Sequence, residues 1–94
     1  MTVGRTVRLR IAGAVQGVGY RYWTEEAAAE LGLSGWVRNR RDGTVEAVIS
    51  GSPQAVEQKI ERCRKGPRAS RVTSIDVQEE PAEPSPGFEV LPTA

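Results

Sequence analysis

Residues 13–21 read Gly-Ala-Val-Gln-Gly-Val-Gly-Tyr-Arg, and the other elements of the chain are arranged around this stretch. It follows residues 5–12, in which apolar and polar side chains alternate as in a half-buried strand, and it precedes a helical pattern. A strand that passes through three glycines into the first turn of a helix leaves several backbone N–H groups without an internal partner. The helix dipole adds partial positive charge at the same place. The stretch therefore predicts a site for an anion.

Arg21 strengthens this prediction, because its guanidinium brings a permanent charge and a planar fork of donors to the same helix end. The usual side-chain caps, Ser, Thr, Asp and Asn, do not occur within residues 13–21. Two familiar nucleotide motifs do not fit. The stretch lacks the lysine of a P-loop, and Tyr22, the residue after it, stands where a dinucleotide fingerprint has its third glycine. The alternative reading is a tight strand-to-helix turn with a solvent-exposed arginine.

Length and composition limit the possible functions. A chain of 94 residues predicts a single domain over residues 1–94. The net charge of +1 argues against nonspecific nucleic-acid binding as the main activity. The sequence has no histidine, so it offers no histidine base or metal ligand, and a single cysteine excludes an internal disulfide. Cys63 falls at helical spacing with Val56 and Ile60, and we expect it to be a small buried hydrophobe.

Membrane association is not predicted. No apolar run approaches the roughly 18 residues of a spanning helix, and the first five residues lack the apolar region of a signal peptide. We therefore expect a cytoplasmic protein with no membrane partner and, by default, a monomer.

Hydrophobic periodicity predicts five strands and two helices. The predicted strands cover residues 5–12, 35–40, 44–50, 73–77 and 88–90, and the predicted helices cover residues 22–31 and 53–65. Turn signals separate them: Gly32 ends the first helix, Asp42-Gly43 marks a hairpin, and Ser52-Pro53 starts the second helix, which ends at Gly66-Pro67. Residues 79–86 carry three prolines and three glutamates and predict a loop.

The order of these elements is that of the α+β, ferredoxin-like split βαβ fold, a sandwich of βαββαβ order plus a short terminal strand. It predicts an antiparallel sheet with two helices on one face. In this arrangement the first two strands run parallel with the third between them, so their C-terminal ends share one edge of the sheet. Asn39 is thereby brought beside residues 13–21. Asn39 is two residues after Val37 in the same strand, so both lie on the same face of the sheet, which we assign to the helix-covered side. The side chain of Asn39 offers one acceptor and two donors there.

These residues resemble the paired signature of the acylphosphatase family. The signature is carried by Gly13-x-Val15-Gln16-Gly17-Val18-Gly19-Tyr20-Arg21 and by Gly35-Trp36-Val37-Arg38-Asn39-x-x-Asp42-Gly43-x-Val45. Two motifs at a matching separation are more specific than either alone. The length and the order of elements agree over nearly all of the chain, and the region after Gly66 departs most from the family.

The resemblance implies metal-independent hydrolysis of acyl phosphates, the mixed anhydrides of a carboxylic acid and phosphate, to carboxylate and inorganic phosphate. It implies that Arg21 binds the phosphoryl group and that Asn39 orients the attacking water. A small-molecule acyl phosphate is the implied partner, and no metal, no cofactor and no covalent enzyme intermediate are implied. The backbone amides implied to hold the phosphate are those of Val15, Gln16, Gly17, Val18, Gly19 and Tyr20.

Two other functions stay open. A non-catalytic module on the same fold could use the loop to bind an anion or a metabolite. RNA-binding domains of this fold stack bases on aromatic side chains of the central strands, but residues 5–12 and 44–50 contain no aromatic residue. Trp36, on the second strand, is expected to pack within the protein. The arginines at positions 38, 40 and 41 are expected to be solvated sheet and turn positions that raise the local anion concentration.

Overall fold

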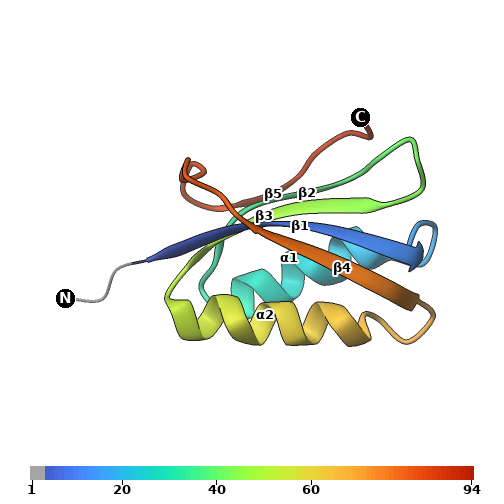
Figure 1. The fold of residues 1–94 in the computed structure, drawn as a ribbon, viewed down its shortest axis with the longest axis horizontal. Helices are drawn as coiled ribbons and strands as arrows, with labels where there is room; N and C mark the ends of the chain where they lie inside the picture. Colours follow the sequence, from blue (N-terminus) through green and yellow to red (C-terminus); the bar gives the residue numbers. More distant parts are fainter. Residues whose placement is uncertain (1–3) are drawn as a thin grey trace.

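Apolar alternation in the first strand builds the centre of the sheet. Val7, Leu9 and Ile11 lie on one face of β1 (Arg5–Ala14), and all three are fully buried. The computed structural model describes residues 4–94 and places β1 inside a five-stranded sheet, with both helices packed against one face (Figure 1). The predicted ferredoxin-like α+β class is confirmed.

The strand order of the sheet is β4-β1-β3-β2-β5. β1 and β2 each pair antiparallel with β3, so they run parallel to each other on its two sides, as predicted. Within residues 4–94, β5 is the exception to the antiparallel pattern, because it pairs parallel with β2. The elements after β1 are α1 (Tyr20–Glu30), β2 (Ser34–Asn39), β3 (Val45–Gly51), α2 (Pro53–Lys65), β4 (Arg71–Glu79) and β5 (Phe88–Val90).

The first helix begins two residues before the predicted range of 22–31. Gly19 is its N-cap, and the Trp23 N–H donates to the Gly19 carbonyl at 3.0 Å. At the other end, the Gly32 N–H donates to the Ala29 carbonyl at 3.2 Å, so the predicted stop at this glycine is confirmed. The earlier start places Arg21 inside the first turn of α1.

The second helix follows its prediction. The Ser52 hydroxyl accepts a hydrogen bond from the Ala55 N–H at 3.2 Å, as an N-cap does. Val56, Ile60 and Cys63 are buried against the sheet. Neither helix of the described residues is long and apolar enough to cross a membrane.

The alternation predicted from Thr73 to Val77 is wrong at its first residue. The pairing of β4 with β1 shifts by one residue between Ala12 and Gly13, so Thr73 stands opposite no residue of β1. Such a bulge reverses the inward and outward parity of the strand. Val72 packs against the core in its place, and Thr73 is exposed.

Other element ends differ from prediction by one or two residues: β1 runs two residues beyond the predicted 5–12, and β4 is two residues longer at each end than the predicted 73–77. β2 begins and ends one residue before the predicted 35–40, and β3 runs on to Gly51. The predicted loop 79–86 begins one residue later, because Glu79 is the last residue of β4. Asn39 is thereby the last residue of β2, at the edge of the sheet.

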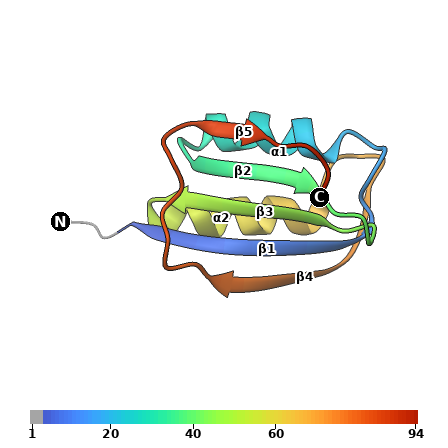
Figure 2. The ribbon, with the colours of Figure 1, turned by 90° about the horizontal axis from the view of Figure 1, so that it is seen from above.

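Four segments meet at one end of the sheet (Figure 2): the loop from β1 to α1, the end of β2, the β2–β3 turn and Ala94. The Ala94 N–H donates to the Asn39 carbonyl at 3.1 Å, and the Ala94 carbonyl accepts from the Arg41 N–H at 3.0 Å. The predicted site residues therefore converge on one edge, as the topology requires.

Candidate active site

The loop between β1 and α1 is fixed at both ends by buried side chains. Val15 and Tyr20 are each 1% exposed, while the residues between them lie nearer the surface. Gly17 and Gly19 have φ of 74° and 78°, in the left-handed region that favours glycine. A Cβ at either position would meet no atom within 4 Å, so the backbone conformation and not a lack of space requires glycine here.

The backbone N–H groups of this loop are unpaired. Those of residues 16–22 find no hydrogen-bond acceptor within the described chain, and the first helical bond is donated by Trp23. Gly19 caps the helix without a side-chain hydrogen bond. Several donors at the positive end of the α1 dipole are therefore without a protein acceptor, an arrangement that is able to take an anion.

Arg21, the second residue of α1, adds a full positive charge at this end. Its side chain is partly exposed, and its guanidinium carbon lies 5.8 Å from the centroid of the Tyr22 ring. No carboxylate in residues 4–94 forms an ion pair with it. The donors of its planar fork are therefore not engaged by an acidic side chain.

Asn39 is held by backbone hydrogen bonds on both sides and carries a side-chain oxygen without a hydrogen-bond partner. It pairs with Val45 of β3 on one side and accepts from the Ala94 N–H on the other. The Asn39 Oδ1 atom is buried and has no hydrogen-bond partner among the described residues. Leaving a buried acceptor unpaired costs about 1–3 kcal/mol, so this atom is a candidate for contact with a ligand or water.

Gln16 contributes more than the backbone amide that was predicted. Its side-chain Nε2 donates to the Arg40 carbonyl at 2.7 Å and to the Thr44 carbonyl at 2.8 Å. Both acceptors belong to the β2–β3 turn, so this side chain ties the loop to the segment that follows Asn39.

The side chain of Tyr20 points into the core. Its hydroxyl donates to the Cys63 carbonyl of α2 at 2.7 Å, and its ring centroid lies 5.3 Å from that of Trp23. Burial raises the pKa of the Tyr20 hydroxyl and also that of the Cys63 thiol, so both stay protonated. Tyr20 therefore anchors the loop to α2, and Cys63 is confirmed as a buried small side chain.

Glu46, the second residue of β3, is a buried charged residue that the sequence interpretation missed. It is 1% exposed and faces away from the helices. Arg38 Nε donates to Oε1 at 2.9 Å, Arg8 donates to Oε2, and Arg40 lies 3.5 Å from Oε1. Burial raises the pKa of Glu46, but the hydrogen bond from Arg38 and the charges of the three arginines outweigh it and leave the pKa below its ordinary value.

This network corrects the expectation of solvated arginines on β2. Arg38 and Arg40 are partly buried partners of Glu46, whereas Arg41 is exposed as predicted. With residues 41–43 as a three-residue loop, Arg38 and Glu46 stand opposite each other on adjacent strands, so the pairing of an arginine with a glutamate is the signal that the sequence offers. Trp36 lies on the same face, partly buried, with the Arg38 guanidinium carbon 4.8 Å from its ring centroid.

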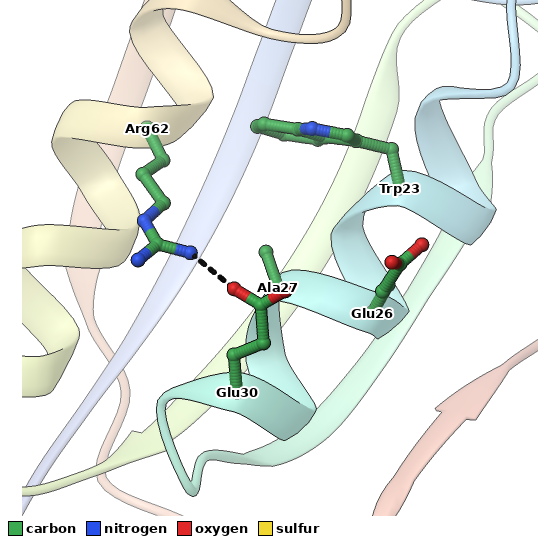
Figure 3. Close-up of a pocket in the computed structure, with 5 residues that line it drawn as sticks. All are labelled: Trp23, Glu26, Ala27, Glu30 and Arg62. Atoms are coloured by element: carbon green, nitrogen blue, oxygen red, sulfur yellow. Dashed lines mark hydrogen bonds and ion pairs between the residues drawn. The ribbon is translucent and has the colours of Figure 1, made fainter.

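A small pocket lies elsewhere, between α1 and α2 (Figure 3). An ion pair of 3.0 Å between Arg62 and Glu30 joins its two walls. None of the residues predicted to hold the anion lines it. Within residues 4–94, no group of three or more His, Cys, Asp or Glu side chains could hold a metal ion. The lining residues are Trp23, Glu26, Ala27, Glu30 and Arg62.

Comparison with known proteins places the chain in a family. A sequence model of the acylphosphatases matches residues 7–90. The chain belongs to the acylphosphatase family. An acylphosphatase of Rhizorhabdus wittichii is 57% identical over 86 residues, which cover 92% of this chain and 87% of that relative.

Solved acylphosphatase structures share the fold. The structure from Bacillus subtilis is 34% identical, with a TM-score of 0.88, and the match covers 95% of this chain and 99% of that one. The structure from Coxiella burnetii is 31% identical, with a TM-score of 0.90, and the match covers 94% and 93%. These similarities confirm the family that the two motifs indicated, and with it an enzyme of the class of hydrolases that act on acid anhydrides.

Proposed function

We propose that this acylphosphatase hydrolyses acyl phosphates without a metal, with the phosphoryl group in the loop of residues 15–20 and the attacking water on Asn39. The observation that supports this most is that backbone donors and a side-chain acceptor, all without hydrogen-bond partners, lie at the same edge of the sheet. The N–H groups of residues 16–22 lack acceptors and suit the oxygens of a phosphoryl group. The buried Oδ1 of Asn39 lacks a donor and suits the O–H of a water.

In this mechanism, the loop amides and Arg21 gather the three equatorial oxygens of the phosphoryl group. Negative charge spreads over these oxygens in the transition state, and fixed donors stabilise it without reorganising. A single preorganised donor of this kind is worth on the order of 10² to 10³ in rate. Arginine suits the position better than lysine, because its planar fork holds two oxygens at once.

The side chain of Asn39 accepts a hydrogen bond from the water and thereby aims a water lone pair at phosphorus. The new bond joins the water oxygen to phosphorus, and the bond from phosphorus to the acyl oxygen breaks. The leaving carboxylate is stable and needs no proton, and an oxygen of the substrate's own phosphoryl group takes the proton of the water. A strong protein base is not required, because positioning and charge stabilisation suffice.

The test is the release of inorganic phosphate from benzoyl phosphate by the wild-type protein with EDTA present. We expect hydrolysis that EDTA does not reduce, and no hydrolysis of p-nitrophenyl phosphate, a monoester with a poorer leaving group. Folded protein that binds phosphate but turns over no acyl phosphate would instead favour the non-catalytic anion-binding module.

Three further properties stay predictions. We propose that residues 1–94 act as one domain, as a monomer and in the cytoplasm. Sedimentation of the purified protein would test the monomer, since a dimer would double the mass expected for the 10.2 kDa chain, and a single cooperative unfolding transition would test the single domain.

A further inference from the structure

We infer that the side chain of Gln16 is a positioning residue, which sets the water-orienting Asn39 relative to the phosphate-binding loop. The inference rests on the proposed function and concerns the same site. Gln16 is part of the loop itself, yet its side chain leaves the loop and reaches the turn between β2 and β3. Its Nε2 donates to the Arg40 carbonyl at 2.7 Å and to the Thr44 carbonyl at 2.8 Å.

The two acceptors bracket the turn, and each is already used once by the turn itself. The Gly43 N–H donates to the Arg40 carbonyl at 3.1 Å, and the Arg40 N–H donates to the Thr44 carbonyl at 2.8 Å. A carbonyl oxygen has two lone pairs, so Gln16 adds a second bond to each without displacing the first. The turn keeps its own geometry and gains a fixed distance to the loop.

A primary amide at this chain length fits the position better than other side chains. One nitrogen must donate twice, which the amide NH₂ group does and a hydroxyl or a carboxylate does not. Methionine has similar length but no donor, and asparagine is one methylene shorter. Glutamate would place a carboxylate oxygen against the Arg40 and Thr44 carbonyls, which are both acceptors.

The turn is directly continuous with Asn39, which precedes Arg40 in the chain. A side chain that fixes Arg40 relative to the loop therefore fixes the distance between the orienting oxygen of Asn39 and the phosphoryl group. A displacement of about 1 Å in such a site is able to cost about 10²-fold in rate. The bond involves neither the backbone N–H groups of the loop nor Arg21, so we expect phosphate to bind without it.

The experiment compares Gln16→Met with wild type on benzoyl phosphate, with inorganic phosphate as a competitive inhibitor. We expect kcat to fall about 10- to 100-fold, while the inhibition constant of phosphate changes by less than about threefold. Gln78→Met is the matched control, since the side chain of Gln78 is exposed on β4 and bonds only Asp76, at 3.3 Å, among the described residues. Folded Gln16→Met with unchanged kcat, or with equal losses of kcat and phosphate affinity, would overturn the inference.

A second measurement does not depend on turnover. In ¹⁵N-labelled Gln16→Met, or in Gln16→Ala if the methionine variant does not fold, we expect the side-chain amide signals of Asn39 to shift. Added phosphate should still shift the backbone signals of Gly17 and Gly19. Unmoved Asn39 signals would overturn the inference even in a protein that hydrolyses acyl phosphate. If wild type turns over no acyl phosphate, the proposed function fails, while shifted Asn39 signals would still support the coupling of the two segments.

Discussion

Lys59 lies in the core, and replacing it with methionine should make the protein more stable. Its side chain on α2 is fully buried, and its Nζ has no hydrogen-bond partner within residues 4–94. Two neighbours offset this cost: the ring of Trp23, whose centroid lies 4.4 Å from Nζ, and the side chain of Cys63, which acts against burial on the pKa of Lys59. Burial lowers the pKa of Lys59, which means that the folded state disfavours the charged amine.

The magnitude follows from two opposing effects. A buried donor without a partner costs about 1–3 kcal/mol, and more when it is charged. A desolvated cation–π contact returns up to about 2 kcal/mol. Methionine fills nearly the same volume and keeps the apolar contacts. We therefore expect Lys59→Met to raise the free energy of unfolding by about 1–2 kcal/mol, which is a gain of roughly 4–16 °C in Tm for a domain of this size.

The pH dependence has a definite sign. Between the lowered pKa of folded Lys59 and the ordinary lysine pKa of about 10.4, the unfolded state binds more protons. Wild type therefore gains stability from this residue as pH rises through that interval. The advantage of Lys59→Met over wild type should shrink between pH 7 and pH 10.5, and comparing the two proteins removes the contributions of other titrating groups.

The assay is urea unfolding followed by tryptophan fluorescence, with Lys65→Met as the control. Lys65 is the other lysine of the chain and is exposed in the last turn of α2, so its replacement should change stability by less than about 0.5 kcal/mol. Destabilisation of Lys59→Met by 1 kcal/mol or more would refute the reasoning, because it would mean that the buried amine makes a net favourable contact.

Three other changes have defined outcomes. Glu46→Gln should lower the free energy of unfolding by about 1–3 kcal/mol, which is less than a fully buried pair would lose because Arg38 is 26% exposed. Since folding lowers the pKa of Glu46, wild type should lose this advantage as pH falls below about 4. Equal urea midpoints of the two proteins at pH 7 would contradict the account. Gly19→Ala should lower the free energy of unfolding by about 1–2 kcal/mol, because alanine disfavours the positive φ of this position, and it should weaken phosphate binding in a fluorescence titration. Unchanged phosphate affinity together with unchanged stability would contradict this prediction. Tyr20→Phe should lose about 1–2 kcal/mol in thermal unfolding, because the buried Cys63 carbonyl loses its donor, and an unchanged Tm would show that this bond contributes nothing.

Topology carried most of what the sequence predicted about the site. The alternation of Val7, Leu9 and Ile11, the hairpin signal and the two helix stripes were enough to give the order of elements. The right-handed crossover then placed Asn39 beside the loop that ends at Arg21, although the two are well separated in sequence. Local patterns and a chirality rule together specify which strand ends meet.

The features that escaped prediction depend on contacts between elements. The bulge at Thr73 arises where β4 meets β1, and nothing in the strand's own alternation reports it. Glu46 stands between the inward-facing Val45 and Ala47 and so has the parity of an outward-facing residue, but arginines from the two neighbouring strands bury it. The side chain of Gln16 likewise bonds only to a turn that folding brings close.

The most direct test of the central claim separates binding from turnover at the two predicted residues. The measurement is kcat on benzoyl phosphate and the inhibition constant of inorganic phosphate, for wild type, Arg21→Lys and Asn39→Ala. We predict that Arg21→Lys loses most activity and binds phosphate more weakly, because lysine keeps the charge but not the fork. We predict that Asn39→Ala loses turnover while phosphate still binds. Equal losses of phosphate affinity in the two variants would contradict the assignment of phosphate to Arg21 and of water to Asn39.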